Sequence, residues 1–392
     1  MRFGANYVPS KGWFYSWMDS DVTSTREDFI AIKDIGFDHI RLHLRWDLFQ
    51  PNPSYYPDCV YDKLEKMLAI AEEVGLDVYI TVFTGWMSGF WFMPSYIRDM
   101  HAITNDEMVK YECKYIDRLA ERVVKHKSFC GIDLGNEFNV YQMFIKDFKV
   151  EEGDKWLNYM TNYVMDKFPG KEVVLGVDHQ PWFGDVQFSR KCLATTGTLT
   201  SLHTWIEFTG ARGFGQDSTE VFSLPEFNVE LANAYADDLD RKVWLQEFGV
   251  IRTWLDESKY ENFVRTTIFN ALRSDNIWGF TWWCSHDINQ EFDVIHPMEK
   301  EFGLLTVNNE LKPLGKYVKE CIADVKKGIN IPQLKSDVAI VIDESKPFYG
   351  WDYGRAYARL IEEGIHAKFV LSSKCEDEEY LNKRNIKELI RI

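Results

Sequence analysis

A (β/α)8 barrel followed by a short α/β segment is the fold class that this sequence predicts. Eight short apolar runs lie between residues 2 and 327, and each is usually followed by an amphipathic stretch. Eight alternations of strand and helix in a chain of this length are typical of a closed parallel barrel. A doubly wound open sheet is the competing fold, but no G-x-G-x-x-G motif follows the first run.

The apolar runs set the positions of the predicted strands and helices. The strands are predicted at residues 2–7, 37–44, 76–83, 130–137, 171–178, 199–205, 242–249 and 277–283. Helical periodicity follows near 22–35, 61–74, 106–126, 152–167, 226–239, 257–274 and 312–327. The fifth unit is the weakest, because residues 179–198 have few periodic apolar positions.

We expect two domains, a barrel of residues 1–330 and a small flavodoxin-like α/β segment of residues 336–392. In the second, strands are predicted at 336–345 and 365–373 and a helix at 352–364, with a last helix at 376–390. A single βαβ unit cannot bury both faces of a parallel sheet by itself. We therefore expect this segment to pack on the barrel or on another subunit.

Charge and composition exclude several classes of function. The formal net charge is -16, and no long cluster of lysine and arginine is present, which argues against nucleic acid or an anionic membrane as the partner. The N-terminal stretch "MRFGANYVPS" does not resemble a signal peptide, and no later segment is apolar enough to span a bilayer. These features predict a cytoplasmic protein.

Cysteine and histidine patterns predict neither disulfides nor a metal site. The seven cysteines are scattered and include no C-x-x-C pair, which is typical of reduced thiols. His39 and His43 are four residues apart, but they lie in a predicted strand without a nearby acidic third ligand. We expect no metal and no cofactor. The 14 tryptophans favour a sugar-binding cleft, although most tryptophans belong to cores.

The chemistry of a barrel lies at the carboxyl ends of its strands, so the residues at these ends are the candidates for a site. Glu247 is notable because it lies in the apolar run "VWLQEFGV", where an unpaired carboxylate is costly. Glu137 ends the fourth predicted strand and can face Glu247 across the barrel mouth. The polar and aromatic strand-end residues are Asn6, Arg41, Trp46, Asn136, Glu137, His203, Trp205, Glu247, Trp282 and Trp283.

A pair of carboxyl groups is what cleavage of a glycosidic bond requires. One acid protonates the leaving oxygen, and one carboxylate meets the developing oxocarbenium ion; in retaining enzymes the two stand about 5 to 5.5 Å apart. Arg41, inside "HIRLHL", would keep Glu247 ionised if it lay beside it. His203 could donate to the same carboxylate or to a sugar hydroxyl. The alternative is that the glutamates form strand-end salt bridges and that His203 is a buried core residue.

Two short motifs resemble those of a known group of enzymes. "GNE" at the end of strand four and "QEFG" at the end of strand seven are similar to the acid/base and nucleophile signatures of clan A glycoside hydrolases. "GANYVPSKGWFYSW" and "DHIRLHLRWDLFQPNP" further resemble family 5, subfamily 18. That subfamily includes bacterial β-mannosidases that act on the mannosyl-β-1,4-N-acetylglucosamine core of N-glycans.

The resemblance implies a role for most of the strand-end residues. Glu137 becomes the general acid/base and Glu247 the nucleophile, while Asn136 binds near the sugar 2-hydroxyl. The resemblance also makes Arg41 and His203 supporters of the nucleophile, and Trp282 the platform under the sugar. Many clan members have a tyrosine just after the histidine of strand six, where this chain reads "HTW". The usual bond from that tyrosine to the nucleophile is therefore in question at Trp205.

The resemblance predicts a retaining exo-β-glycosidase, with an oligosaccharide as substrate and a β-mannosidase as the leading hypothesis. Residues 83–101 and 203–222 are long strand-end segments that would narrow the cleft and favour exo action. The alternatives are a β-galactosidase, a β-glucosidase, an endo-β-mannanase or an inactive sugar-binding barrel. Residues 336–392 also resemble the flavodoxin-like domain of family 42 β-galactosidases, which implies a homotrimer formed through this segment.

Overall fold

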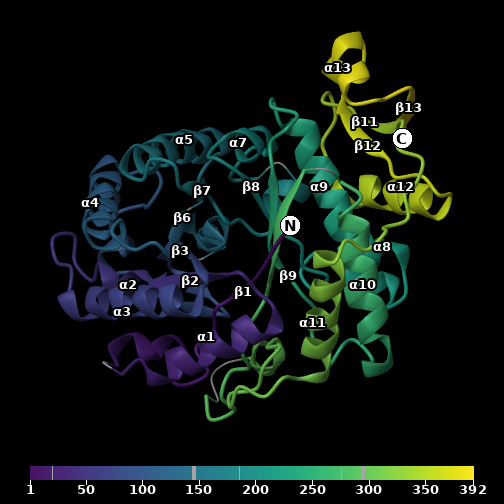
Figure 1. Cartoon of the computed structure of the whole chain (residues 1–392). Helices are drawn as coiled ribbons and strands as arrows, with labels where there is room; N and C mark the ends of the chain where they lie inside the picture. The colour runs from purple at the N-terminus through teal and green to yellow at the C-terminus, as the bar shows by residue number, and fades with distance from the viewer. Residues whose placement is uncertain (20, 144–146, 185, 275, 293–295) are drawn as a thin grey trace.

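The barrel consists of eight parallel strands in one sheet that closes almost completely on itself (Figure 1). The computed structural model describes residues 1–19, 21–143, 147–184, 186–274, 276–292 and 296–392. The strand order is β7-β6-β3-β2-β1-β10-β9-β8, which confirms the predicted (β/α)8 fold. The strands are β1 (Arg2–Asn6), β2 (His39–Arg45), β3 (Asp77–Thr84), β6 (Phe129–Gly135), β7 (Glu172–Val174), β8 (Thr200–His203), β9 (Val243–Phe248) and β10 (Ile277–Trp282).

The helices surround the sheet close to the predicted positions. The main ones are α1 (Thr23–Ile35), α3 (Asp58–Val74), α4 (Asp106–Val123), α5 (Val150–Lys167), α9 (Leu224–Tyr235), α10 (Tyr260–Ala271) and α11 (Pro313–Lys326). Shorter ones are α2 (Trp46–Phe49), α6 (Gln180–Phe183), α7 (Arg190–Thr195) and α8 (Thr219–Phe222). The 3-10 helices are η1 (Trp13–Met18), η2 (Ser95–Arg98), η3 (Phe138–Met143), η4 (Ala211–Phe214), η5 (Glu257–Lys259) and η6 (Pro297–Glu301), and β4 (Trp86–Met87) pairs with β5 (Phe90–Trp91).

The fifth unit is short in the structure as well. Strand β7 ends at Val174 instead of continuing to 178, because the backbone turns toward the barrel centre, where the N–H of Gly176 donates to Asp133 over 2.8 Å. Helix α7 is six residues long and is capped by Ser189, whose side chain accepts from the N–H of Cys192. The seam between β7 and β8 is bridged by Ser201, which donates to the carbonyl of Leu175 over 2.6 Å.

Residues 336–392 form a three-stranded parallel sheet of order β12-β11-β13, with helices on it. The elements are β11 (Val338–Ile342), α12 (Gly350–Glu362), β12 (Lys368–Leu371), η7 (Ser372–Lys374), α13 (Glu378–Lys383) and β13 (Glu388–Arg391). The prediction of a helix over 376–390 is wrong in its second half. Asn385 has a φ of 52°, after which 388–391 pairs with β11. We propose that this C-terminal unit is a second domain.

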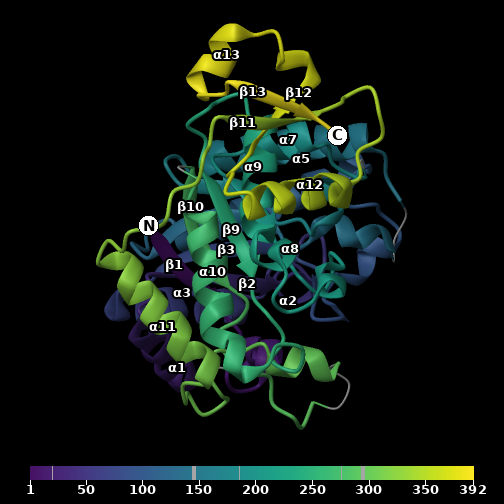
Figure 2. The ribbon, with the colours of Figure 1, turned by 90° about the vertical axis from the view of Figure 1, so that its right-hand side faces the viewer.

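The C-terminal unit packs on the barrel (Figure 2). Phe227 of α9 contacts the rings of Tyr357 on α12 and Phe369 on β12, with centroids 5.9 and 5.6 Å apart. The opposite face of the small sheet packs against Tyr380 and Leu381 of α13. Both apolar faces are therefore covered within one chain, which removes the physical reason for a trimer; the trimer itself stays a prediction. None of the helices in the described residues has the length and apolarity needed to cross a membrane.

Candidate active site

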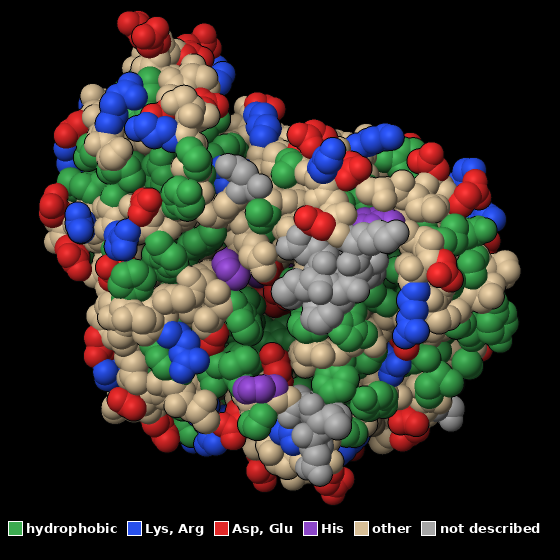
Figure 3. Space-filling view, turned by 180° about the vertical axis from the view of Figure 1, so that it is seen from behind, with side chains coloured by type: hydrophobic (Ala, Val, Ile, Leu, Met, Phe, Trp, Pro, Cys, Tyr) green, Lys and Arg blue, Asp and Glu red, His purple; other side chains and the backbone are tan. Residues whose placement is uncertain are grey.

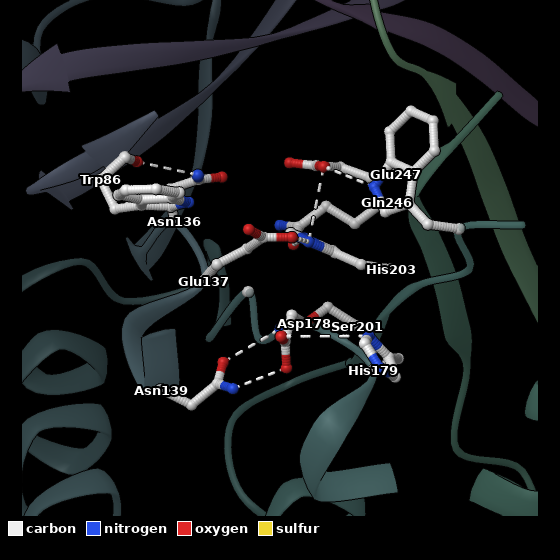
Figure 4. Close-up of polar contacts among 12 residues, drawn as sticks. Trp86, Asn136, Glu137, Asn139, Asp178, His179, Ser201, His203, Gln246 and Glu247 are labelled. Atoms are coloured by element: carbon white, nitrogen blue, oxygen red, sulfur yellow. Dashed lines mark hydrogen bonds and ion pairs between the residues drawn. The ribbon is translucent and has the colours of Figure 1, made fainter. Parts of the chain in front are cut away.

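Two glutamates face each other at the carboxyl ends of the barrel strands (Figure 4). Glu137 is the second residue after β6, and Glu247 is the fifth residue of β9. Their carboxylate oxygens approach to within 4.8 Å of each other. Glu137 has a φ of 44°, in the left-handed backbone region that few residues other than glycine adopt. This spacing suits a double displacement, in which the two carboxyl groups act on one glycosidic bond.

Arg41 lies beside Glu247 and is completely buried, in agreement with the sequence analysis. It donates to Oε1 of Glu247 and, over 2.9 and 2.6 Å, to Oδ2 of Asp133. Its remaining hydrogen bonds, each 3.0 Å long, go to the side-chain oxygens of Asn6 and Asn136. The guanidinium is thus paired with two carboxylates, which compensates for its burial and fixes its position.

Trp205 provides the second donor to Glu247. Its indole N–H points at Oε2 of the carboxylate over 3.2 Å, so each oxygen of Glu247 accepts a hydrogen bond. The sequence did not show which group replaces the tyrosine that many clan members place beside the nucleophile. In the structure, the indole of Trp205 donates the hydrogen bond to Glu247. Burial raises the pKa of Glu247, while His203 and Arg41 act in the opposite direction.

His203 lies between the two glutamates. Its Nδ1 is 3.1 Å from Glu137 and 3.5 Å from Glu247, and its Nε2 is 3.1 Å from Oε1 of Gln246. Burial lowers the pKa of His203, so the ring is neutral at neutral pH. Within the described residues, this trio of Glu137, His203 and Glu247 has the spacing to hold a metal ion. Arg41 already bonds to one of its carboxylates, and the trio equally suits acid–base chemistry.

Asp178, just beyond β7, influences Glu137 from the other side. Burial and the charge of Asp178 raise the pKa of Glu137 to about 8. Asp178 itself accepts hydrogen bonds from the side chain of Asn139 (2.6 Å) and from the backbone and side chain of Gln180 (2.8 and 3.1 Å). With a pKa of about 8, Glu137 carries a proton at neutral pH, as a general acid requires. The sequence analysis missed Asp178, although it ends the fifth predicted strand.

A cavity of about 370 Å³ joins these groups. Figure 3 shows a hollow on this face, with acidic side chains inside it and histidines at its edge. The sequence analysis expected residues 83–101, which contain the hairpin of β4 and β5, to narrow the cleft, but it did not identify the residues near 296–302 as part of the wall. The lining residues are Trp86, Met87, Ser88, Gly89, Asn136, Glu137, Val140, Asp178, His179, Gln180, Trp205, Phe208, Glu247, Trp283, His296, Glu299 and Phe302.

Two of the expected sugar-binding tryptophans lie outside the cavity. Trp46 is 0% exposed, donates to Gln50 over 3.0 Å and packs on Phe83. Trp282 is 1% exposed and packs on Phe248 in the barrel core. Successive side chains of a strand point to opposite sides, so Trp283 lines the cavity where Trp282 was expected.

A (β/α)8 barrel with paired glutamates across a cavity at its mouth is the architecture of a glycoside hydrolase. A family model described as cellulase, glycosyl hydrolase family 5, matches residues 4–289. The chain therefore belongs to glycoside hydrolase family 5. A search of curated proteins gives no match.

Solved structures of subfamily 18 are similar to the whole chain. A GH5_18 protein from Bifidobacterium longum subsp. infantis is 30% identical, with a TM-score of 0.93 over 100% of this chain and 96% of that one. A glutamate-to-alanine GH5_18 variant from Streptomyces cattleya, in complex with Manβ1-4GlcNAc, is 29% identical, with a TM-score of 0.94 over 100% and 98%. A similar variant from Bifidobacterium longum subsp. longum, with the same disaccharide, is 29% identical, with a TM-score of 0.92 over 100% and 96%.

Proposed function

We propose that this enzyme is a retaining exo-β-mannosidase that hydrolyses mannosyl-β-1,4-N-acetylglucosamine and similar short β-mannosides. The observation that carries the proposal is the pair Glu137 and Glu247, whose carboxylates approach within 4.8 Å across the cavity. The sugar is proposed from the two similar GH5_18 structures, which hold Manβ1-4GlcNAc. A disaccharide of this kind would come from the breakdown of N-glycans.

In the first step, Glu247 attacks the anomeric carbon of the mannosyl unit while Glu137 protonates the glycosidic oxygen. The carbon–oxygen bond to N-acetylglucosamine breaks, and an α-linked mannosyl-enzyme ester forms on Glu247. In the second step, Glu137 takes a proton from water, which attacks the same carbon and releases β-mannose. Glu137 thereby returns to its protonated form.

The surroundings of the two glutamates support different protonation states. Glu247 accepts hydrogen bonds from Arg41 and Trp205, and both donors stabilise the ionised form that a nucleophile needs. Glu137 has a pKa raised to about 8 by burial and by Asp178, so it carries a proton at neutral pH. Burial raises the pKa of Glu247 as well, and His203 and Arg41 oppose that rise; a protonated acid opposite a nucleophile held by donors is what the two roles require.

Exo action is supported by the walls of the cavity. The hairpin of β4 and β5 contributes Trp86 to Gly89 on one side, and the segment after β8 contributes Phe208. A volume of about 370 Å³ is near the lower end for small-molecule sites. The cavity therefore fits a short oligosaccharide better than an internal stretch of a polysaccharide.

A substrate panel tests this proposal. Para-nitrophenyl β-mannoside, β-glucoside and β-galactoside are compared with Manβ1-4GlcNAc and with mannan, and the first anomer released is identified by NMR. We expect the highest kcat/KM on the mannosides, release of β-mannose first, and little action on mannan. Preference for the galactoside or glucoside, internal cleavage of mannan, or binding without hydrolysis would each contradict the proposal.

A further inference from the structure

We infer that Trp351 of the C-terminal unit is a positioning residue for the active site, because it holds two of the segments that line the cavity. Helix α12 begins at Gly350, and Trp351 is its second residue. Its indole N–H donates to the carbonyl of Thr209 over 2.6 Å. Its ring also contacts Phe214 and Phe183, with centroids 4.9 and 5.6 Å apart.

The first connection runs through α6. Phe183 contacts the ring of His179 at 5.8 Å, and His179 and Gln180 line the cavity next to Asp178. Gly350 allows the close approach, since a Cβ at that position would come within 2.3 Å of the Phe183 ring. Helix α6 is only four residues long and has few hydrogen bonds of its own, so its position depends strongly on contacts from outside the barrel.

The second connection runs through the segment after β8. Thr209, which accepts from Trp351, donates its hydroxyl to the carbonyl of Trp205 over 2.6 Å. Phe208 lies between these two residues and lines the cavity, with its ring 5.9 Å from that of Trp205. Trp205 in turn donates to Glu247. A chain of three hydrogen bonds thus leads from the C-terminal unit to a glutamate of the site.

The same helix supplies a matched control. Tyr357 also lies on α12 and is buried, but it contacts Phe227 of α9 and Phe369 of the small sheet and not the cavity segments. No hydrogen bond of its hydroxyl is found among the described residues. Tyr357→Phe therefore alters the same helix without removing a hydrogen bond, whereas Trp351→Phe removes the hydrogen bond to the cavity segment.

Kinetics of the full-length chain give the first test, which rests on glycosidase activity but not on the identity of the sugar. The substrate is the aryl β-glycoside that the wild-type enzyme hydrolyses best. Loss of the hydrogen bond predicts that Trp351→Phe lowers kcat/KM roughly fivefold, mainly through KM, whereas Tyr357→Phe leaves kcat/KM unchanged. The double variant Trp351→Phe/Phe208→Ala should lose much less kcat/KM than the product of the losses of the two single variants, because both changes disturb the same segment. Unchanged kcat/KM, or losses that simply multiply, would overturn the inference.

Hydrogen–deuterium exchange gives a test that does not depend on activity, so it still decides if the proposed function fails. Trp351→Phe should speed exchange of the amides in residues 205–210 by about fivefold, because the segment loses a fixed contact. Tyr357→Phe should leave these amides unchanged. Equal exchange of residues 205–210 in Trp351→Phe and wild type would show that Trp351 does not position this segment.

Discussion

Trp205 donates its indole N–H to Oε2 of Glu247 over 3.2 Å, while Arg41 donates to Oε1. Both oxygens of the proposed nucleophile are therefore held by donors that cannot lose their proton in the working pH range. A phenol in the same place could also accept a hydrogen bond, whereas an indole can only donate. The arrangement favours a single orientation and a single charge state of Glu247.

Trp205→Phe should raise the pKa of Glu247, because the ionised carboxylate loses a donor. Glu247 acts as the ionised form, so the acid limb of the kcat/KM profile should move to higher pH by about one unit, the size expected for a hydrogen bond to a charged group. The alkaline limb serves as the internal control and should not move. Trp205→Tyr, which can offer an O–H, should restore part of the shift. An acid limb that does not move in Trp205→Phe would show that the indole of Trp205 contributes packing contacts and no hydrogen bond that affects the pKa of Glu247.

Asp178→Asn should move the alkaline limb of the pH profile of activity. Burial and Asp178 raise the pKa of Glu137 to about 8, and activity on a poor leaving group falls as pH rises through this value and the acid loses its proton. Removing the charge of Asp178 lowers that pKa, so the alkaline limb should move to lower pH by about one unit. Asp217→Asn, the same change at an exposed site paired with Lys259, is the matched control. Equal profiles for the two variants would exclude Asp178 as the cause.

Trp283 and Trp282 should respond differently to substitution. Trp283 lines the cavity, so Trp283→Ala should raise KM about tenfold, equivalent to about 1.4 kcal/mol of binding free energy, and leave the fold intact. Trp282→Ala opens the barrel core and should cost about 3 to 5 kcal/mol of the free energy of unfolding. Denaturant titration and steady-state kinetics on both variants check this. A Trp282 variant that folds well but binds substrate poorly would reverse the assignment.

The contrast between these two tryptophans shows what the sequence could and could not predict. Residues at strand ends are recognisable because apolar runs end there, and the structure brings four of these residues together: Glu137, Glu247, Arg41 and His203. Which of two adjacent residues faces the cavity depends on the register at the end of the strand, and Trp282 was wrong for that reason.

Contacts between segments that are distant in the sequence account for the other features that the sequence did not predict. Asp178 was missed although it ends the fifth predicted strand; β7 leaves the ladder at Val174, and the irregular chain beyond it brings Asp178 to the cavity. The contact between Trp351 and Thr209 joins parts of the chain that are distant in sequence, and no local pattern indicates it. Residues 388–390 belonged to the predicted helix over 376–390, although the segment 388–391 completes the small sheet through pairing with β11.

Glu247→Gln should abolish nearly all hydrolysis and preserve the fold, because the glutamine amide has the size of the carboxylate but cannot act as the nucleophile that forms the glycosyl ester. Glu112→Gln is the matched control. Glu112 is a fully buried carboxyl outside the cavity, bonded to Trp156, and burial raises its pKa well above the usual value, so it is already neutral. Kinetics and thermal unfolding compare the two. Near-normal turnover by Glu247→Gln would contradict its assignment as the nucleophile.

The most direct test of the proposed mechanism is pre-steady-state kinetics of Glu137→Ala on two substrates that differ in the leaving group. Manβ1-4GlcNAc needs the acid, so its rate should fall by a factor on the order of 10² to 10⁴. From a nitrophenyl β-mannoside the nitrophenolate leaves with little help from an acid, so a burst of nitrophenol should precede slow turnover as the mannosyl-enzyme accumulates. Azide should then speed the slow phase and yield a β-mannosyl azide. Equal losses on both substrates, with no burst and no response to azide, would show that Glu137 is not the acid/base.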